Sequence, residues 1–264
     1  MDKYMEIVEF LDYDSRKRVL VEPLDRYDMI RDQVFTIIDE NLPEVVVKAG
    51  LGDGRLLLDI AVKSEKLYIL AVEPSWERIT SFMEENRGKP GFDRVRIIHG
   101  DFHEFPVDYY AADFFIVIDH LDIFDISRCI DQFKISMTFD AVLLYGGVVL
   151  QNDDVEGVYD DYMRLLLPLH NDYYLEDDLK TFLDLKDFKF IRGSALDFIM
   201  NNNALREHLR KYHNHNAAEV EDFYTGHEKE FREIYNLDDA GNLRERFFLG
   251  MFRRVMPETG DKIV

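Results

Sequence analysis

The spacing of three glycines, Gly50, Gly52 and Gly54, is the clearest chemical signal in this sequence. An apolar, β-branched run at 45–47 precedes them, and a helical pattern opening with leucines at 56–58 follows. A buried strand that ends in a glycine turn lets backbone N–H groups approach a ligand that any Cβ would push away. The pattern therefore predicts a strand, a ligand-binding turn and a helix.

An acidic residue, Glu73, closes a second apolar run at 67–72. It follows the glycine turn by about 20 residues, the distance at which an acid in a βαβ unit meets ribose hydroxyls. Strand, glycine turn, helix, strand and acid together predict a nucleoside-binding site.

The glycines follow the spacing G-x-G-x-G, because Arg55 stands where the G-x-G-x-x-G pattern of dinucleotide-binding proteins has its last glycine. The shorter spacing resembles motif I of the class I S-adenosylmethionine-dependent methyltransferases. This resemblance implies that Gly50, Gly52 and Gly54 wrap the methionine part of the cofactor S-adenosylmethionine. It also implies that Glu73 holds the ribose.

Later segments resemble the same family in order and spacing, over roughly residues 28–256. Asp101 follows the third apolar run, at 94–99, and the resemblance implies that it contacts the adenine amino group while Phe102 helps to frame the base. The resemblance implies an α/β fold with a doubly wound, seven-stranded, mostly parallel Rossmann-like sheet. The remaining strands are expected near 112–120, 141–150, 187–191 and 245–252.

Lys48 departs from the family pattern, which usually has Asp or Glu two residues before the first glycine. The family's acid helps to hold the methionine end of the cofactor. We expect Lys48 to pair with a carboxylate, either that of the cofactor or that of Asp119 or Asp53. The alternatives are that the cofactor site is lost, or that the chain uses a modified adenosylmethionine.

Asp119 and His120 end the fourth predicted strand and therefore face the crevice in which an open parallel sheet binds its ligand. His120 is the candidate general base, since an ordinary histidine pKa near 6.5 suits proton removal at neutral pH. The alternative is that His120 caps the strand or stacks on the adenine edge. Asp119 is expected to contact the methionine end of the cofactor or the acceptor.

Two metal-site hypotheses are weaker. Carboxylate and amide oxygens after the fourth and fifth strands could hold a hard cation, but their spacing is not diagnostic in so acidic a chain, and we predict no metal. A histidine cluster without a supporting cysteine is expected to be solvated. The hard-cation site would comprise Asp119, His120, Asp122, Asn152 and Asp153. The histidine cluster comprises His208, His213 and His215.

Aromatic residues between the fifth and sixth strands have two interpretations: they line an acceptor pocket, or they pack in the core. The set comprises Tyr145, Tyr159, His170, Tyr173 and Tyr174. Cys129 lies in a helical stretch away from the strand ends and is expected to be an unreactive core thiol.

The amino-acid composition indicates which classes of binding partner and which compartment to expect. The 264 residues include 53 acidic and 32 basic side chains, giving a net charge of −21, which disfavours nucleic acid. A single cysteine permits no intrachain disulfide and suits the cytoplasm. No apolar run approaches the about 20 residues that span a bilayer, so no membrane partner is expected.

We expect an N-terminal helical cover at 1–43 and a methyltransferase-like domain at 44–264. A helical insertion at about 195–242 would serve as a lid or as a contact between copies of a homo-oligomer. The resulting hypothesis is a methyltransferase acting on a small-molecule acceptor. The alternative from another class is a methyltransferase-like binding or scaffold protein without activity.

Overall fold

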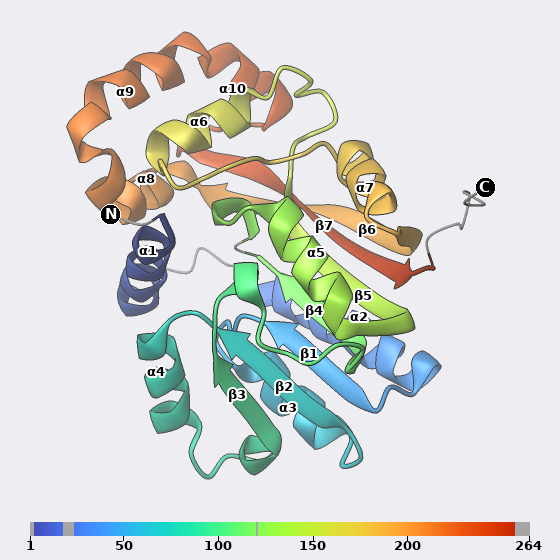
Figure 1. Cartoon of the computed structure of the whole chain (residues 1–264). Helices are drawn as coiled ribbons and strands as arrows, with labels where there is room; N and C mark the ends of the chain where they lie inside the picture. The colour runs from blue at the N-terminus through green and yellow to red at the C-terminus, as the bar shows by residue number, and fades with distance from the viewer. Residues whose placement is uncertain (1–2, 18–23, 120, 257–264) are drawn as a thin grey trace.

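The computed structural model describes residues 3–17, 24–119 and 121–256. A seven-stranded sheet lies between two layers of helices, in the order β3-β2-β1-β4-β5-β7-β6 (Figure 1). Strands β1 to β5 run parallel, and β7 is antiparallel to both of its neighbours. The strands are β1 (Val45–Ala49), β2 (Tyr68–Glu73), β3 (Val95–His99), β4 (Ala112–Ile118), β5 (Met137–Val149), β6 (Phe188–Asn201) and β7 (Asn242–Arg254).

The predicted doubly wound, mostly parallel sheet is confirmed, because helices cover both of its faces. The α-helices are α1 (Lys3–Lys17), α2 (Leu24–Asn41), α3 (Arg55–Lys63), α4 (Trp76–Asn86), α5 (Ile126–Ser136), α6 (Val158–Leu166), α7 (Glu176–Leu185), α8 (Asn202–His213), α9 (Ala217–Gly226) and α10 (Glu228–Ile234). Short 3-10 turns occupy Phe92–Arg94, Phe102–Glu104, Leu121–Ile123 and Asn214–Asn216.

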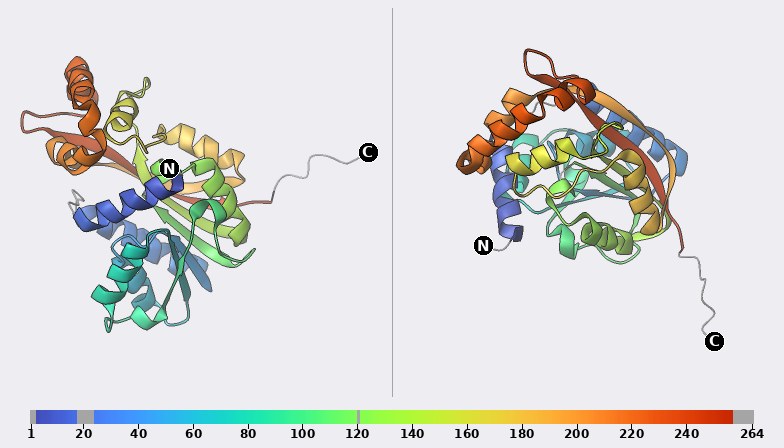
Figure 2. Two further views of the ribbon diagram at one scale, coloured as in Figure 1. Left: turned by 60° about the vertical axis from the view of Figure 1, so that its left-hand side comes forward. Right: turned by 90° about the horizontal axis from the view of Figure 1, so that it is seen from above.

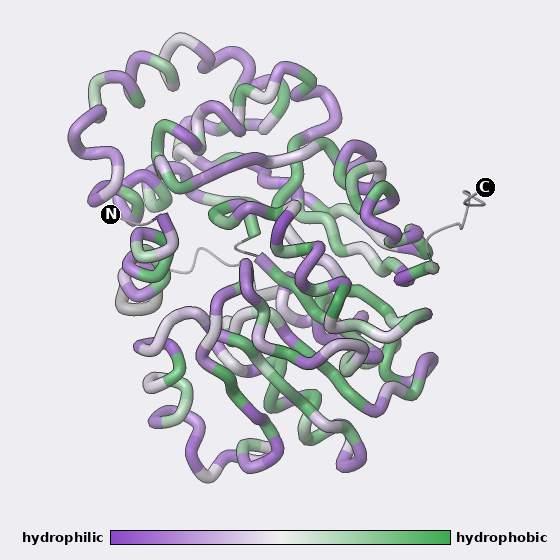
Figure 3. Tube along the Cα trace, viewed as in Figure 1, coloured by the Kyte–Doolittle hydropathy of each residue, from purple (hydrophilic) through white to green (hydrophobic). Residues whose placement is uncertain are grey.

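Alternation along the central strands separates two hydrophobic cores. Val46 and Phe114 face a core shared with α2, α3 and α4, whereas Val47 and Phe115 face a core shared with α1, α5, α6 and α7. Neighbouring residues of a strand point to opposite faces, so a strand covered on both sides must be apolar throughout. The central strands are accordingly hydrophobic, while the α8–α10 region is largely hydrophilic (Figure 3).

The last two strands are longer than predicted. β6 was expected to end at 191 but continues to Asn201, and β7 begins at Asn242 rather than 245. The two strands pair from Phe188 with Arg254 to Asn201 with Asn242. Because β6 is an edge strand with mostly exposed side chains, it lacks the apolar pattern that marks a buried strand. The helices between them therefore occupy 202–234, a shorter span than 195–242.

The remaining boundaries agree more closely. β5 begins at Met137, four residues before the predicted start at 141. The described residues before β1 are largely helical as expected, in α1 and α2. Within the part of the chain that the structure describes, none of the helices has both the length and the apolar character required to cross a bilayer.

Candidate active site

A cavity of about 550 Å³ lies where the parallel strands end. Its floor includes the last residues of β1, β2, β4 and β5, which are Ala49, Glu73, Ile118 and Val149. Side chains of α1 and α8 also line it, and Figures 1 and 2 show α1 lying between α4 and α8. Ligand pockets commonly measure about 300–1,000 Å³, so the cavity is large enough for a nucleoside and a second small molecule.

The glycine turn is shaped by backbone conformations that favour glycine. Gly50, Gly52 and Gly54 have φ of +77°, +61° and +81°. A Cβ on Gly54 would lie 2.4 Å from ring carbons of Phe82, so close packing against α4 also requires glycine there. All three conformations lie in the left-handed region, where a side chain is strained. The turn therefore presents main chain, without side-chain bulk from these positions, to the cavity.

Glu73 holds the turn in place and lines the cavity as well. Its Oε2 accepts the backbone N–H of Leu51 at 2.8 Å, and its Oε1 accepts that of Ser75 at 3.0 Å. An ionised carboxylate offers about four lone-pair sites, so these two bonds leave acceptor capacity for ligand hydroxyls. One buried acid thus joins the glycine turn to the start of α4.

Lys48 is buried, and its Nζ donates to the carbonyl oxygen of Gly50 at 2.6 Å. Lys48 thus donates to the main chain, where pairing with a carboxylate was expected. Burial lowers the pKa of Lys48 to about 8, although the charges of Glu73, Asp119 and Asp53 oppose that fall. The ammonium group consequently stabilises the conformation of the glycine turn through this hydrogen bond.

Of the two residues expected to contact the adenine, only Phe102 lines the cavity, and Asp101 does not. Phe102 lines the cavity, and its ring would lie 3.8 Å from a Cβ on Gly50. Asp101 caps a 3-10 turn by accepting the N–H of His103 at 2.8 Å, and it is not among the described residues that line the cavity. The structure therefore brings Phe102 to the glycine turn and leaves Asp101 beside the site.

Asp119 lines the cavity at the end of β4, with φ of +59°. Its carboxylate forms an ion pair with Arg26 of α2, whose guanidinium lies 4.0 Å from the centre of the Phe247 ring. The candidate base His120 lies outside the described residues. Arg26 was missed in the sequence because one arginine in an amphipathic helix carries no signal of its partner.

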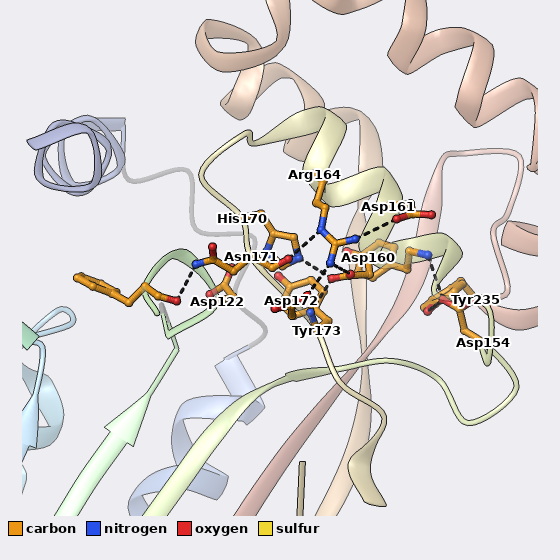
Figure 4. Close-up of polar contacts among 12 residues, drawn as sticks. Asp122, Asp154, Asp160, Asp161, Arg164, His170, Asn171, Asp172, Tyr173 and Tyr235 are labelled. Atoms are coloured by element: carbon orange, nitrogen blue, oxygen red, sulfur yellow. Dashed lines mark hydrogen bonds and ion pairs between the residues drawn. The ribbon is translucent and has the colours of Figure 1, made fainter. Parts of the chain in front are cut away.

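Figure 4 shows linked polar and charged side chains around His170. His170 is buried between two carboxylates, with Nδ1 3.1 Å from Asp122 and Nε2 2.7 Å from Asp160. Burial alone would lower the pKa of His170, but the two hydrogen bonds and charges raise it to about 9. Arg164 pairs with the other oxygen of Asp160 at 2.6 Å. His170 is therefore a cation at neutral pH and fixes Asp122, which lines the cavity.

Glu245 of β7 is a cavity-lining acid that the sequence analysis did not single out. The hydroxyl of Tyr159 donates to its Oε1 at 2.9 Å. Burial raises the pKa of Glu245 to about 6, with Arg26 opposing the rise and Asp119 and Asp122 adding to it. The only sequence signal was its position in a predicted strand, which does not say which end of the sheet it faces.

Three of the aromatic residues expected at an acceptor pocket line the cavity: Tyr145, Tyr173 and Tyr174. Tyr159 and His170 lie behind the wall, where they hold Glu245 and Asp122. Both interpretations of the aromatic segment thus apply, to different members of the set.

Comparison with solved structures identifies the fold. YcgJ from Bacillus subtilis aligns over 86% of this chain and 98% of its own, at 13% identity and a TM-score of 0.71. An S-adenosylmethionine-dependent methyltransferase from Methanosarcina mazei aligns over 84% and 98%, at 14% identity and a TM-score of 0.54. This is the class I methyltransferase fold. A phosphoethanolamine N-methyltransferase from Haemonchus contortus, in complex with phosphomonomethylethanolamine and S-adenosylhomocysteine, aligns over 85% of this chain and 53% of its own, at 14% identity and a TM-score of 0.54.

Comparison of the amino-acid sequence with known families and proteins, by contrast, finds no match. No protein-family model matches the chain, and no curated protein matches it in sequence. At 13–14% identity, the structural likeness establishes the class I methyltransferase fold and leaves reaction and substrate to the residues of the site.

Of the three histidines expected to be solvated, His215 is exposed, whereas the side chains of His208 and His213 are largely covered. His208 bonds through Nε2 to Asp14 of α1 at 2.9 Å, and His213 is buried. Both are covered because α8 packs against α1 and α6. Among the described residues there is no group of three or more His, Cys, Asp or Glu placed to hold a metal ion. Cys129 is fully buried, and burial raises its pKa, as expected for a core thiol.

Proposed function

We propose that this chain is an S-adenosylmethionine-dependent methyltransferase acting on a small molecule held in the cavity. The observation that carries the proposal is the convergence of the glycine turn, Glu73 and Phe102 at one cavity, at the carboxyl ends of the parallel strands. Open α/β sheets bind ligands at this edge. The cofactor bound by the neighbours supports S-adenosylmethionine as the donor.

The residues present fit an adenosyl group. Gly50 and Gly52 offer main chain to the cavity, and Gly54 keeps the turn packed against Phe82, where a Cβ would collide. Glu73 keeps lone pairs for ribose hydroxyls, and the flat ring of Phe102 is suited to pack on a base. Lys48 and Asp119, which both line the cavity, are proposed to meet the carboxylate and ammonium groups of the methionine end.

When bound, S-adenosylmethionine supplies a methyl group on a positively charged sulfur. The protein's part in such a transfer is to align the acceptor and to exclude water. In this chain, α1 is fixed over the cavity by its neighbours on both sides. Asp14 pairs with Arg78 of α4 at 3.0 Å and with His208 of α8 at 2.9 Å.

We assign the covering role to residues 1–43 and to the α8–α10 segment, and the cofactor-binding role to the remainder of 44–264. The enclosure by α1 and α8 and the net charge of −21 both favour a small molecule over nucleic acid. His120 and Asp119 remain the predicted catalytic pair, with His120 as base. A homo-oligomer remains a prediction for the α8–α10 segment.

Titration calorimetry with S-adenosylhomocysteine tests the proposal. We expect micromolar binding to the unaltered chain and a loss of at least tenfold in Gly54→Ala, because the new methyl group displaces Phe82 and strains the turn. Gly226→Ala is the matched control, since a Cβ there meets no atom within 4 Å and the φ is not in the left-handed region. No binding to the unaltered chain would leave a scaffold with a methyltransferase fold, and binding of only a modified adenosylmethionine would assign that role to Lys48.

A further inference from the structure

The part of the cavity beyond the glycine turn has more carboxylates than cations. Asp119 and Asp122 line it and are each matched by a cation, Arg26 and His170 respectively. Glu245 also lines it; its carboxylate accepts the Tyr159 hydroxyl and forms no ion pair with a cation among the described residues. The charge of Arg26 acts on Glu245 without forming such a pair and offsets only part of the effect of burial. Removing a carboxylate from water without a cation in direct contact is costly, so this end of the cavity favours a ligand that brings a positive charge.

A second, independent feature points to the same ligand. Tyr145 of β5 is only 7% exposed and lines the cavity. Its hydroxyl has no hydrogen-bond partner among the described residues. That hydroxyl lies next to the main chain of Gly147, itself a cavity residue, since a Cβ on Gly147 would be 3.1 Å from it. The oxygen is not among the fully buried atoms that lack a partner, so it is open to the cavity and can pair with a polar group of a ligand.

The surrounding wall suits an alkylammonium group better than an anion. Tyr173 and Tyr174 line this end, and tyrosine rings attract cations through their faces. His170 and Tyr159 hold the acids in place from behind. An acceptor with a carboxylate or phosphate at its reacting end would meet the carboxylate of Glu245 and be repelled.

We propose that the acceptor is a small amine, bound as its ammonium ion by the carboxylate of Glu245 and the hydroxyl of Tyr145. This proposal rests on the methyltransferase function proposed above and names its substrate class. Glu245 would contact the reacting nitrogen directly and, for an amine acceptor, would take the place of His120 as the proton acceptor. Tyr145 would accept one N–H of the ammonium ion and orient it.

The chemistry balances with these groups. The ammonium nitrogen gives one proton to Glu245, and its freed lone pair forms the new N–C bond to the methyl group. The C–S bond breaks, and its electron pair goes to sulfur, leaving a neutral thioether. The methylated nitrogen retains a positive charge, and Glu245 passes its proton to solvent. A carboxylate with a raised pKa, here about 6, is a stronger proton acceptor than an ordinary one.

The experiment uses the full chain saturated with S-adenosylhomocysteine and a panel of probes matched in shape. Tyramine, 2-phenylethylamine and N-methylethanolamine are each compared with the alcohol and the carboxylic acid of the same skeleton. Thermal shift and calorimetry measure binding, and transfer of a labelled methyl group from S-adenosylmethionine measures reaction. We expect the amines, and not their alcohols or acids, to bind and to accept the methyl group.

Substitutions at Glu245 and Tyr145 test whether these two residues bind the amine. Glu245→Gln should weaken amine binding at least tenfold, and Tyr145→Phe about threefold to tenfold, while both keep the affinity for S-adenosylhomocysteine. Glu219→Gln, on the exposed surface of α9, is the matched control and should change neither. Failure to bind S-adenosylhomocysteine would refute the methyltransferase function itself. Normal cofactor binding with no response to any amine, with preference for alcohols or acids, or with unchanged amine binding in Glu245→Gln would overturn the amine proposal alone.

Discussion

The buried pair of hydrogen bonds at His170 makes a quantitative prediction about stability and pH. The folded pKa of about 9 exceeds the value of 6.5 expected in the unfolded chain. At about 1.4 kcal/mol per pKa unit, this difference corresponds to about 3 kcal/mol of folding free energy. The ring is completely buried, so solvent screening takes little from this figure.

The sign follows from proton binding. The folded chain binds this proton more tightly than the unfolded chain, so the contribution is fully present below pH 6.5. It is lost as the pH rises through about 9. We expect the gap in unfolding free energy between the unaltered chain and His170→Gln to be about 3 kcal/mol larger at pH 6 than near pH 10. Because the two proteins share all their other titratable groups, the difference between their unfolding free energies isolates the contribution of His170.

Urea unfolding followed by circular dichroism, from pH 6 to pH 10, measures the gap. If the free energy of unfolding falls by about 3 kcal/mol per molar urea, the predicted change corresponds to roughly 1 M in the difference between the urea midpoints of the two proteins. His227→Gln is the matched control, because Nδ1 of His227 contacts the Phe223 carbonyl oxygen at 3.0 Å rather than a carboxylate. A gap for His170→Gln that stays constant across this range would refute the assignment of a charged, doubly paired imidazole.

Three further predictions concern other parts of the fold. Gly54→Ala should lower the free energy of unfolding by about 1–3 kcal/mol, measured in urea, because it combines a left-handed φ with a clash at Phe82. Cys129 should react with an aromatic disulfide reagent only when the chain unfolds, so equal rates in native and urea-unfolded protein would contradict its burial. Asp154→Asn should cost about 2 kcal/mol in the same urea assay, since Asp154 accepts bonds from two N–H groups at the start of α6 and from the Tyr235 hydroxyl. An unchanged midpoint would show that this cap contributes little.

The sequence was most informative where structure is local. The glycine turn and the acid that ends β2 depend on residues close together in the chain, and each was predicted. Strands buried on both faces were predictable for the same reason, because they must be apolar throughout. The edge strand β6 was underestimated, since its exposed residues impose no such pattern.

The acceptor end of the cavity was not predictable in the same way. Arg26, Asp122 and Glu245 come from α2, the turn after β4 and β7, and only the folded chain brings them together. Their importance depends on burial and on the charge of their neighbours, which sequence spacing does not encode. His208 was misjudged likewise, because its partner Asp14 lies 194 residues away.

The central claim is that the glycine turn and Glu73 enclose an adenosyl group. A crystal structure of the chain with S-adenosylhomocysteine tests it most directly. The account predicts density for the base against Phe102, with ribose hydroxyls within hydrogen-bond distance of the Glu73 carboxylate. Density for the ligand elsewhere, or a ribose without contact to Glu73, would contradict it.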